Sequence, residues 1–94
     1  MAYQAVVHRR EDSVAVAVAP LTSGEELEVH ALEGGPPLKI RVLEAIPLGH
    51  KVALHEIPEG TEVIKYGEKI GRAVRTIPAG AHVHVHNLKS LKWG

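Results

Sequence analysis

The chain has 94 residues, 11 basic and 11 acidic side chains that leave no formal net charge, and no cysteine. It has no basic stripe for nucleic acid, no thiol for a disulfide or thiolate metal site, and no apolar run near the about 20 residues of a membrane helix. The first residues lack the long apolar run of a signal peptide, so we expect none there. We therefore expect residues 1–94 to form one small cytoplasmic domain that binds neither nucleic acid nor membrane.

Short apolar segments with alternating polarity predict a mostly β protein. A hairpin is expected near the N-terminus, and the glycines and prolines at residues 34–37 indicate a turn between two further strands. One helical alternative stays open over residues 23–32, where Ser23 could cap a short helix. The predicted strands, in chain order, cover residues 2–8, 14–21, 27–32, 38–43, 50–57, 62–67 and 82–88.

An internal repeat links several of these strands. The segments "VALHEIPEGTEV" (52–63) and "RAVRTIPAGAHV" (72–83) share the pattern Ile-Pro-x-Gly 20 residues apart, and residues 16–27 form a weaker copy. Proline ends a strand because it cannot donate to the ladder, and glycine accepts the positive φ of a turn. The repeat therefore predicts corners that bend a small sheet back on itself.

Several motifs in residues 48–87 occur in a characteristic order. Gly49-His50-Lys51 is followed by an Ile-Pro-x-Gly corner, Ile64-Lys65-Tyr66-Gly67, Ile70-Gly71, a second corner and "HVHVHN" (82–87). This set resembles the N-terminal SAF domain of the altronate and galactarate dehydratase family, which also occurs as the small subunit of sulfolactate sulfo-lyase. The resemblance implies a small β-clip fold, which is a twisted assembly of short strands.

The same resemblance implies a function. Members of this family are hydro-lyases, or a sulfo-lyase, that act on hydroxylated acids with a divalent metal, commonly Fe²⁺ and alternatively Mn²⁺. Most of their catalytic machinery, including most metal ligands, lies in a larger domain or subunit. The chain therefore resembles a small subunit or excised domain that is inactive alone and works beside a large catalytic dehydratase subunit.

Three histidines alternate in "HVHVHN". On a strand, His82, His84 and His86 would share one face and the intervening valines would pack on the other. The alternatives are a functional face and an ordinary polar strand face. With the resemblance, we expect His84 and His86 to be catalytic and to ligate a metal, Asn87 to contact substrate, and His82 to lie at the surface.

Basic residues supply the remaining candidates. Lys51 and Lys65 could pair with a substrate carboxylate, and His50 could orient a hydroxyl or carry a proton, although a plain exposed loop also explains residues 49–51. Tyr66 is expected to pack its ring in a core with few aromatic residues.

Two classes of function follow. In the first, the chain helps a large subunit bind a sugar acid, or closes its active site. In the second, it is a non-enzymatic SAF module that binds a ligand or forms a homo-oligomer through its valine-rich faces.

Overall fold

The computed structural model describes residues 4–9, 11–65 and 67–90. Every regular element in these ranges is a β-strand, which confirms the mostly β fold. The alternative of a helix over residues 23–32 is wrong, because Leu27 and Val29 alternate on the buried face of a strand. Nowhere in the described ranges is there a helix of the length and hydrophobicity needed to span a bilayer. The strands are β1 (Ala5–Val7), β2 (Val14–Ala17), β3 (Glu26–Ala31), β4 (Leu38–Arg41), β5 (Lys51–Ala53), β6 (Glu62–Lys65), β7 (Glu68–Ala73), β8 (His82–Val83) and β9 (Leu88–Ser90).

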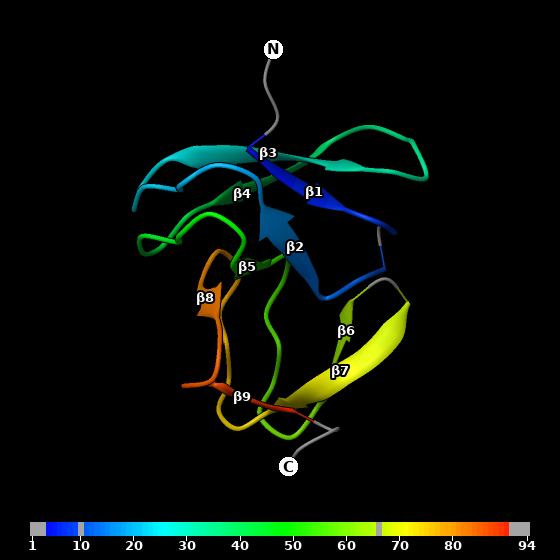
Figure 1. The fold of residues 1–94 in the computed structure, drawn as a ribbon, viewed down its shortest axis with the longest axis vertical. Coiled ribbons are helices and arrows are strands. Elements are labelled where there is room, and N and C mark those ends of the chain that lie inside the picture. Colours follow the sequence, from blue (N-terminus) through cyan, green and yellow to red (C-terminus); the bar gives the residue numbers. More distant parts are fainter. Residues whose placement is uncertain (1–3, 10, 66, 91–94) are drawn as a thin grey trace.

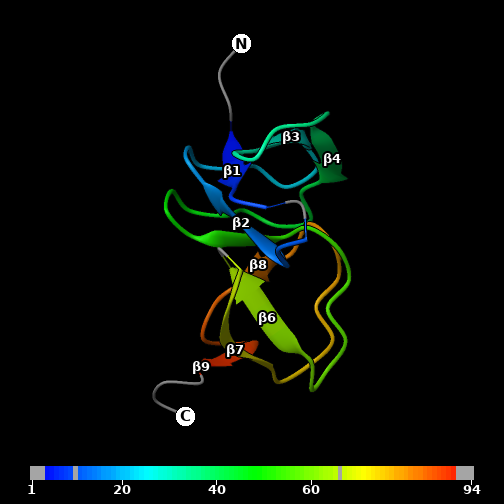
Figure 2. The same cartoon turned by 90° about the vertical axis from the view of Figure 1, so that its right-hand side faces the viewer.

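These strands form two sheets. The larger has the order β4-β3-β1-β2-β5-β8, and the smaller has the order β6-β7-β9 (Figure 1). Strands β1 and β2 pair antiparallel, as the predicted hairpin requires, and β3 pairs antiparallel with β4 around the turn at residues 34–37. The smaller sheet occupies the lower part of the molecule in both orthogonal views, opposite β1, β3 and β4 of the larger sheet (Figure 2).

Two hydrophobic clusters fill the molecule, and β2 and β5 lie between them. Ala15 and Ala17 of β2 pack into the first cluster and Val14 into the second. Val52 and Ala53 of β5 divide in the same way. Both strands are therefore apolar at consecutive positions, as expected for strands buried on both faces. The other buried members are Ala5, Val7, Leu21, Leu27, Val29, Val42 and Ile46 in the first cluster, and Ile57, Val63, Ala73, Ile77, Ala81 and Val83 in the second.

The predicted corners are confirmed, and residues 46–49 form a further one. Each ends in a glycine with φ between 84° and 90°, namely Gly24, Gly49, Gly60 and Gly80. In each, the amide after the glycine donates to the carbonyl three residues earlier, as His50 does to Pro47. A positive φ at the third position of such a turn defines type II geometry, which favours glycine.

The corners associate in pairs. Leu21 and Ile46 exchange both backbone hydrogen bonds across an isolated bridge, and Ile57 and Ile77 do the same. All these side chains are buried. Each corner is therefore anchored by its first apolar residue and by the backbone of a second corner.

Parts of the strand prediction differ from the structure. Residues 68–73 and 88–90 form β7 and β9, which the sequence pattern does not predict. Strand β7 begins with exposed Glu68 and Lys69, so its start has the polarity of a loop. The strand predicted over residues 82–88 ends at Val83. Tyr66 lies outside the described residues.

A buried polar link joins the two sheets. The carboxylate of Asp12 accepts a hydrogen bond from the amide of Gly67, at 3.0 Å. The hydroxyl of Ser13 accepts one from the amide of Ile64, and the Ser13 amide donates to the Ile64 carbonyl. These bonds tie the loop before β2 to the β6–β7 hairpin, so they also position Lys65 at the end of β6.

Alanine at Gly80 is expected to destabilise the fold strongly. The residue has a φ of +86°, and an added Cβ would overlap the backbone carbonyl of Arg41. Gly60 occupies the equivalent place in the neighbouring corner, where the described part of the chain leaves open space around an added Cβ. Gly60→Ala should lower the free energy of unfolding by only roughly 1–2 kcal/mol, which is the cost of placing an L-alanine in the left-handed backbone conformation.

Gly80→Ala should lower the free energy of unfolding by at least about 2 kcal/mol more than this control, because the packed backbone around Arg41 must move to accept the added Cβ. Urea unfolding followed by circular dichroism measures both losses. Equal losses at the two glycines would contradict the steric explanation.

Candidate functional site

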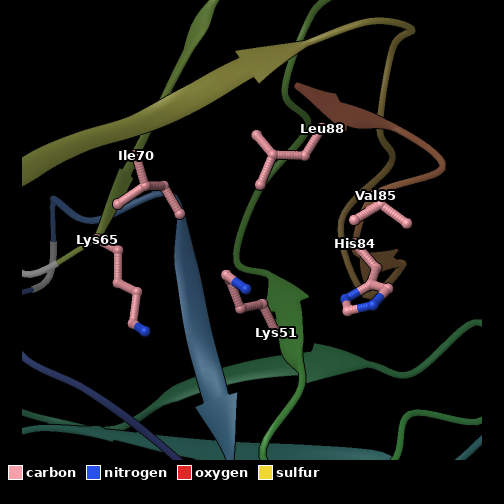
Figure 3. Close-up of a pocket in the computed structure, with 6 residues that line it drawn as sticks. All are labelled: Lys51, Lys65, Ile70, His84, Val85 and Leu88. Atoms are coloured by element: carbon pink, nitrogen blue, oxygen red, sulfur yellow. The ribbon is translucent and has the colours of Figure 1, made fainter. Parts of the chain in front are cut away.

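A cavity of about 300 Å³ lies where the two sheets meet (Figure 3). It is large enough for a small organic acid. Ile70 and Leu88 provide apolar walls, and nitrogen-bearing side chains face the same space. We call it the lysine pocket; it is lined by Lys51, Lys65, Ile70, His84, Val85 and Leu88.

Two lysines bring positive charge to this pocket. Lys51 begins β5, Lys65 ends β6, and both are half-buried. The pKa of Lys51 lies below its ordinary value, first because burial disfavours the charged form and second because the charge of Lys65 is near. No carboxylate in the described part of the chain forms an ion pair with Lys51. An anionic ligand would therefore offset the repulsion between the two ammonium groups.

A cluster of three imidazoles adjoins the pocket; we call His50, His82 and His84 the histidine cluster. Lys51 pairs with Val83 across β5 and β8, so the next residues in register, His50 and His84, lie opposite each other. Nδ1 of His50 is 2.8 Å from Nε2 of His82. One ring nitrogen from each histidine lies within 4.8 Å of the others. The rings of His50 and His84 stack at a centroid distance of 4.6 Å.

Two members of the cluster, His82 and His84, favour the uncharged imidazole. The pKa values of His82 and His84 lie below their ordinary value, first because of desolvation and then because of neighbouring imidazoles, with His50 foremost. Lys51 lowers the pKa of His84 further, whereas the Glu44 carboxylate opposes the shift at His82. Both rings are therefore neutral near pH 7 and keep a lone pair available for a proton or a metal.

The expected alternation of histidines and valines along one strand is wrong beyond Val83, where β8 ends and a loop begins. Buried Asn87 donates its side-chain amide to the His82 carbonyl at 2.8 Å, and its side-chain oxygen accepts from the His84 amide at 3.0 Å. These bonds close a turn after Val83. Val85, expected to pack beneath the histidines, is instead 81% exposed. Asn87 therefore supports the segment that carries His82 and His84.

The structure brings most predicted site residues together. His50 belongs to the histidine cluster, Lys51 and Lys65 line the lysine pocket, and His84 belongs to both. His86 is exposed, with its ring centroid 5.4 Å from that of His82. Catalysis by His84 and His86, and substrate contacts by His50, Lys51, Lys65 and Asn87, stay predictions.

His82 is the site residue that the sequence pattern misplaces. It was expected at the surface, but it is half-buried and bonded to His50, 32 positions away in the chain. That contact exists because β5 pairs with β8, which no local pattern indicates. Ile70 and Leu88 were also missed as site residues. Ile70 lies on β7, which the pattern did not predict, and Leu88 begins β9 instead of ending the predicted strand over residues 82–88.

The histidine cluster has the ligand chemistry of a metal site. Neutral imidazoles suit Zn²⁺, Fe²⁺ and similar ions, whereas Ca²⁺ and Mg²⁺ prefer oxygen. Within the described ranges, the group of side chains close enough to share an ion is His50, His82 and His84. The predicted ligand pair was His84 and His86. This group contains His84 but has His50 and His82 in place of His86.

Comparison with known proteins agrees with the motifs that carried the resemblance. A family model described as the altronate/galactarate dehydratase SAF domain matches residues 3–91. The (2R)-sulfolactate sulfo-lyase subunit alpha of Chromohalobacter salexigens is 40% identical over 94 residues, which cover 99% of this chain and 100% of that subunit.

Two longer relatives match through one part of their length. The altronate dehydratase of Escherichia coli is 42% identical over 79 residues, or 84% of this chain and 15% of the relative. The altronate dehydratase of Bacillus subtilis is 37% identical over 81 residues, or 86% of this chain and 15% of the relative. On the strength of the family model and the full-length match, the chain belongs to the altronate/galactarate dehydratase SAF domain family.

Proposed function

We propose that the chain is the small subunit, or the corresponding domain, of a lyase that acts on a hydroxylated acid. In this proposal the lysine pocket binds an anionic group of the substrate beside a large catalytic subunit. The observation that carries the proposal is the convergence of Lys51, Lys65 and the neutral His84 on one cavity with apolar walls. The sulfo-lyase subunit and the dehydratases among the relatives support the reaction class.

The proposed reaction is a β-elimination. A base takes the proton from the carbon next to the carboxylate, and the electron pair of that C–H bond forms a carbon–carbon double bond. The bond to the leaving group on the next carbon breaks, and the group departs with its electron pair, as water after protonation or as sulfite. The resulting enol then becomes a 2-keto acid.

Each group in the pocket has a place in this reaction. The ammonium groups of Lys51 and Lys65 would hold the anionic group, which fixes the substrate relative to the base. His84 would hydrogen-bond a hydroxyl or carry a proton to the leaving group. Ile70 and Leu88 would restrict water around the reacting carbons. The large subunit would supply the base, and the expected Fe²⁺ or Mn²⁺ would stabilise developing negative charge.

Two lysines in one pocket favour a substrate with two negative charges. Sulfolactate has a carboxylate and a sulfonate, and galactarate has two carboxylates, whereas altronate has one. The match over the whole length of a sulfo-lyase subunit favours sulfolactate among these acids. We therefore propose a dianionic hydroxy acid as the substrate class. The cytoplasmic location expected from the sequence stays a prediction.

The oligomerisation alternative has less support. It requires exposed valine-rich faces, but Val14, Val29, Val52, Val63 and Val83 are all buried, and the exposed valines Val18, Val74 and Val85 come from three separate segments. The apolar surface of the buried valines is already used in the two cores of the chain. A ligand-binding module without a catalytic partner is the alternative that the following experiment separates from the lyase proposal.

Purification from native cells under mild conditions should recover the chain with a larger partner in fixed stoichiometry. That complex is expected to release sulfite from (2R)-sulfolactate, or water from galactarate or altronate, while the separate chain does neither. Mass spectrometry identifies the partner, and a 2-keto acid assay measures turnover. A chain without a partner, or a complex inactive on all three acids, would contradict the proposed function.

In the assembled complex, Lys51→Ala should raise the substrate KM about tenfold or more, because a charge-assisted hydrogen bond is lost. Lys39→Ala is the matched control, since Lys39 is an exposed strand lysine on β4 outside the lysine pocket. Its KM should stay within about twofold of the wild-type value. Equal KM values for both variants would remove Lys51 from the substrate site.

The affinity of the same complex should depend on alkaline pH. Lys51 attracts an anion only while it is protonated, and its pKa is lowered from 10.5. The wild-type KM should therefore rise with pH below the range in which an ordinary lysine loses its charge. This rise should be absent from the pH profile of Lys51→Ala. A rise of the same size in that variant would show that another group causes it.

A further inference from the structure

We propose that the histidine cluster, His50, His82 and His84, binds one transition-metal ion in this chain without help from a large subunit. This inference goes beyond the lyase proposal, because it concerns a site complete within the 94 residues.

The spacing of the nitrogens supports such a site. Imidazole nitrogens lie about 2.0–2.1 Å from a bound first-row metal, so neighbouring ligand nitrogens lie roughly 3.0–3.4 Å apart. The His50–His82 nitrogens are separated by 2.8 Å, and all three ligand nitrogens lie within 4.8 Å of one another. Small rotations of the rings would bring the cluster to ligand spacing.

The backbone around the cluster is well held. His50 follows Gly49, and its backbone amide closes the type II turn by donating a hydrogen bond to the Pro47 carbonyl. His82 belongs to β8, and both its carbonyl and the His84 amide are bonded by the buried side chain of Asn87. The ligands thus come from a corner, a strand and a closed turn. This preorganised arrangement differs from a flexible histidine tag, whose chelation depends on sequence alone.

The charges nearby also permit a cation. The Glu44 carboxylate accepts a hydrogen bond from the His82 amide at 3.1 Å. Lys51 is the competing positive group, because it lines the same pocket as His84 and its charge lowers the pKa of that histidine. Lys51 and Glu44 are thus the charged groups whose effects on the cluster oppose each other.

The ligand set indicates the class of ion. Three imidazoles without a thiolate suit Zn²⁺, Fe²⁺, Co²⁺ or Ni²⁺. Three protein ligands also leave coordination positions free for water or a ligand, as in catalytic rather than structural zinc sites. Because His84 belongs to both the cluster and the lysine pocket, a bound ion would adjoin the place where we propose that an anion binds.

Titration of the tag-free 94-residue chain with Co²⁺ tests this site directly. The visible absorption of the bound ion reports coordination and gives the stoichiometry and Kd. We expect saturable binding of one ion per chain. His50→Gln, His82→Gln and His84→Gln should each weaken binding at least about tenfold, since loss of even a supporting group around a metal costs 10–100-fold.

Two further variants control for other histidines. His55→Gln removes an exposed histidine whose Nδ1 lies 2.9 Å from the neighbouring Glu56 carbonyl oxygen. His86→Gln removes the remaining histidine of "HVHVHN" and tests the predicted pair of His84 and His86 as the sole ligands. His55→Gln should keep the wild-type Kd within about threefold, because surface substitutions away from the ligands have small effects. His86→Gln should weaken binding less than the loss of any histidine of the cluster, since its ring neighbours His82 without belonging to the cluster. Thermal melts without Co²⁺ show whether each variant is folded.

The critical variant is His50→Gln, because His50 lies outside "HVHVHN". Unchanged Co²⁺ affinity in a folded His50→Gln chain would overturn the three-histidine site, as would the absence of saturable binding to the wild type. Either failure would leave the lyase proposal standing, since that is judged by a partner and turnover. Conversely, an inactive complex would leave the Co²⁺ result unaffected.

Discussion

The positive φ at the end of each corner is the constraint on which the rest of this structure depends. Gly24, Gly49, Gly60 and Gly80 all adopt it, and each reverses the chain within a short turn. An L side chain in this conformation is strained, so the sharp reversal depends on glycine. The apolar residue that begins each corner is buried, which fixes the turn against a core rather than leaving it mobile. The corners therefore set where the short strands begin.

The two small cores depend on this arrangement. Strands β2 and β5 contribute to both cores, so consecutive alanines and valines must fit on opposite sides of one sheet. The chain has no phenylalanine, and its cores consist of aliphatic side chains. Such a fold leaves little room for added volume, since well-packed interiors tolerate extra methylene groups poorly. Rigidity here comes from many short strands with anchored ends.

The same scaffold concentrates basic side chains despite the zero formal charge of the chain. The paired strands β5 and β8 bring His50 and Lys51 to the segment that carries His82 and His84. The buried link from Asp12 and Ser13 holds the β6–β7 hairpin, and with it Lys65, on the other side of the lysine pocket. The fold thus holds groups that repel one another when charged. Binding of an anion or loss of protons is the physical way to relieve that repulsion.

Local sequence pattern determined much of this protein. A resemblance to a known family supplied Lys51, His50 and His84 as candidate site residues, whereas the local pattern predicted short strands, glycine corners and the hairpin of β1 and β2. These features depend on alternation along a strand or on turn chemistry within a few residues. Strand β7 was missed because its first residues are polar and exposed, which is typical of a loop. Exposed polar side chains are nevertheless compatible with a strand, since the backbone forms the hydrogen bonds of the sheet.

Only the tertiary structure decided how the histidines are arranged. His82 meets His50 because β8 pairs with β5, and His84 turns toward the lysine pocket because Asn87 ends the strand and closes the next turn. Neither event follows from the alternation of "HVHVHN", which predicted one straight face and a buried Val85. Strand pairing across 32 residues depends on the competition of all strands for partners and core volume, and local patterns do not encode that competition.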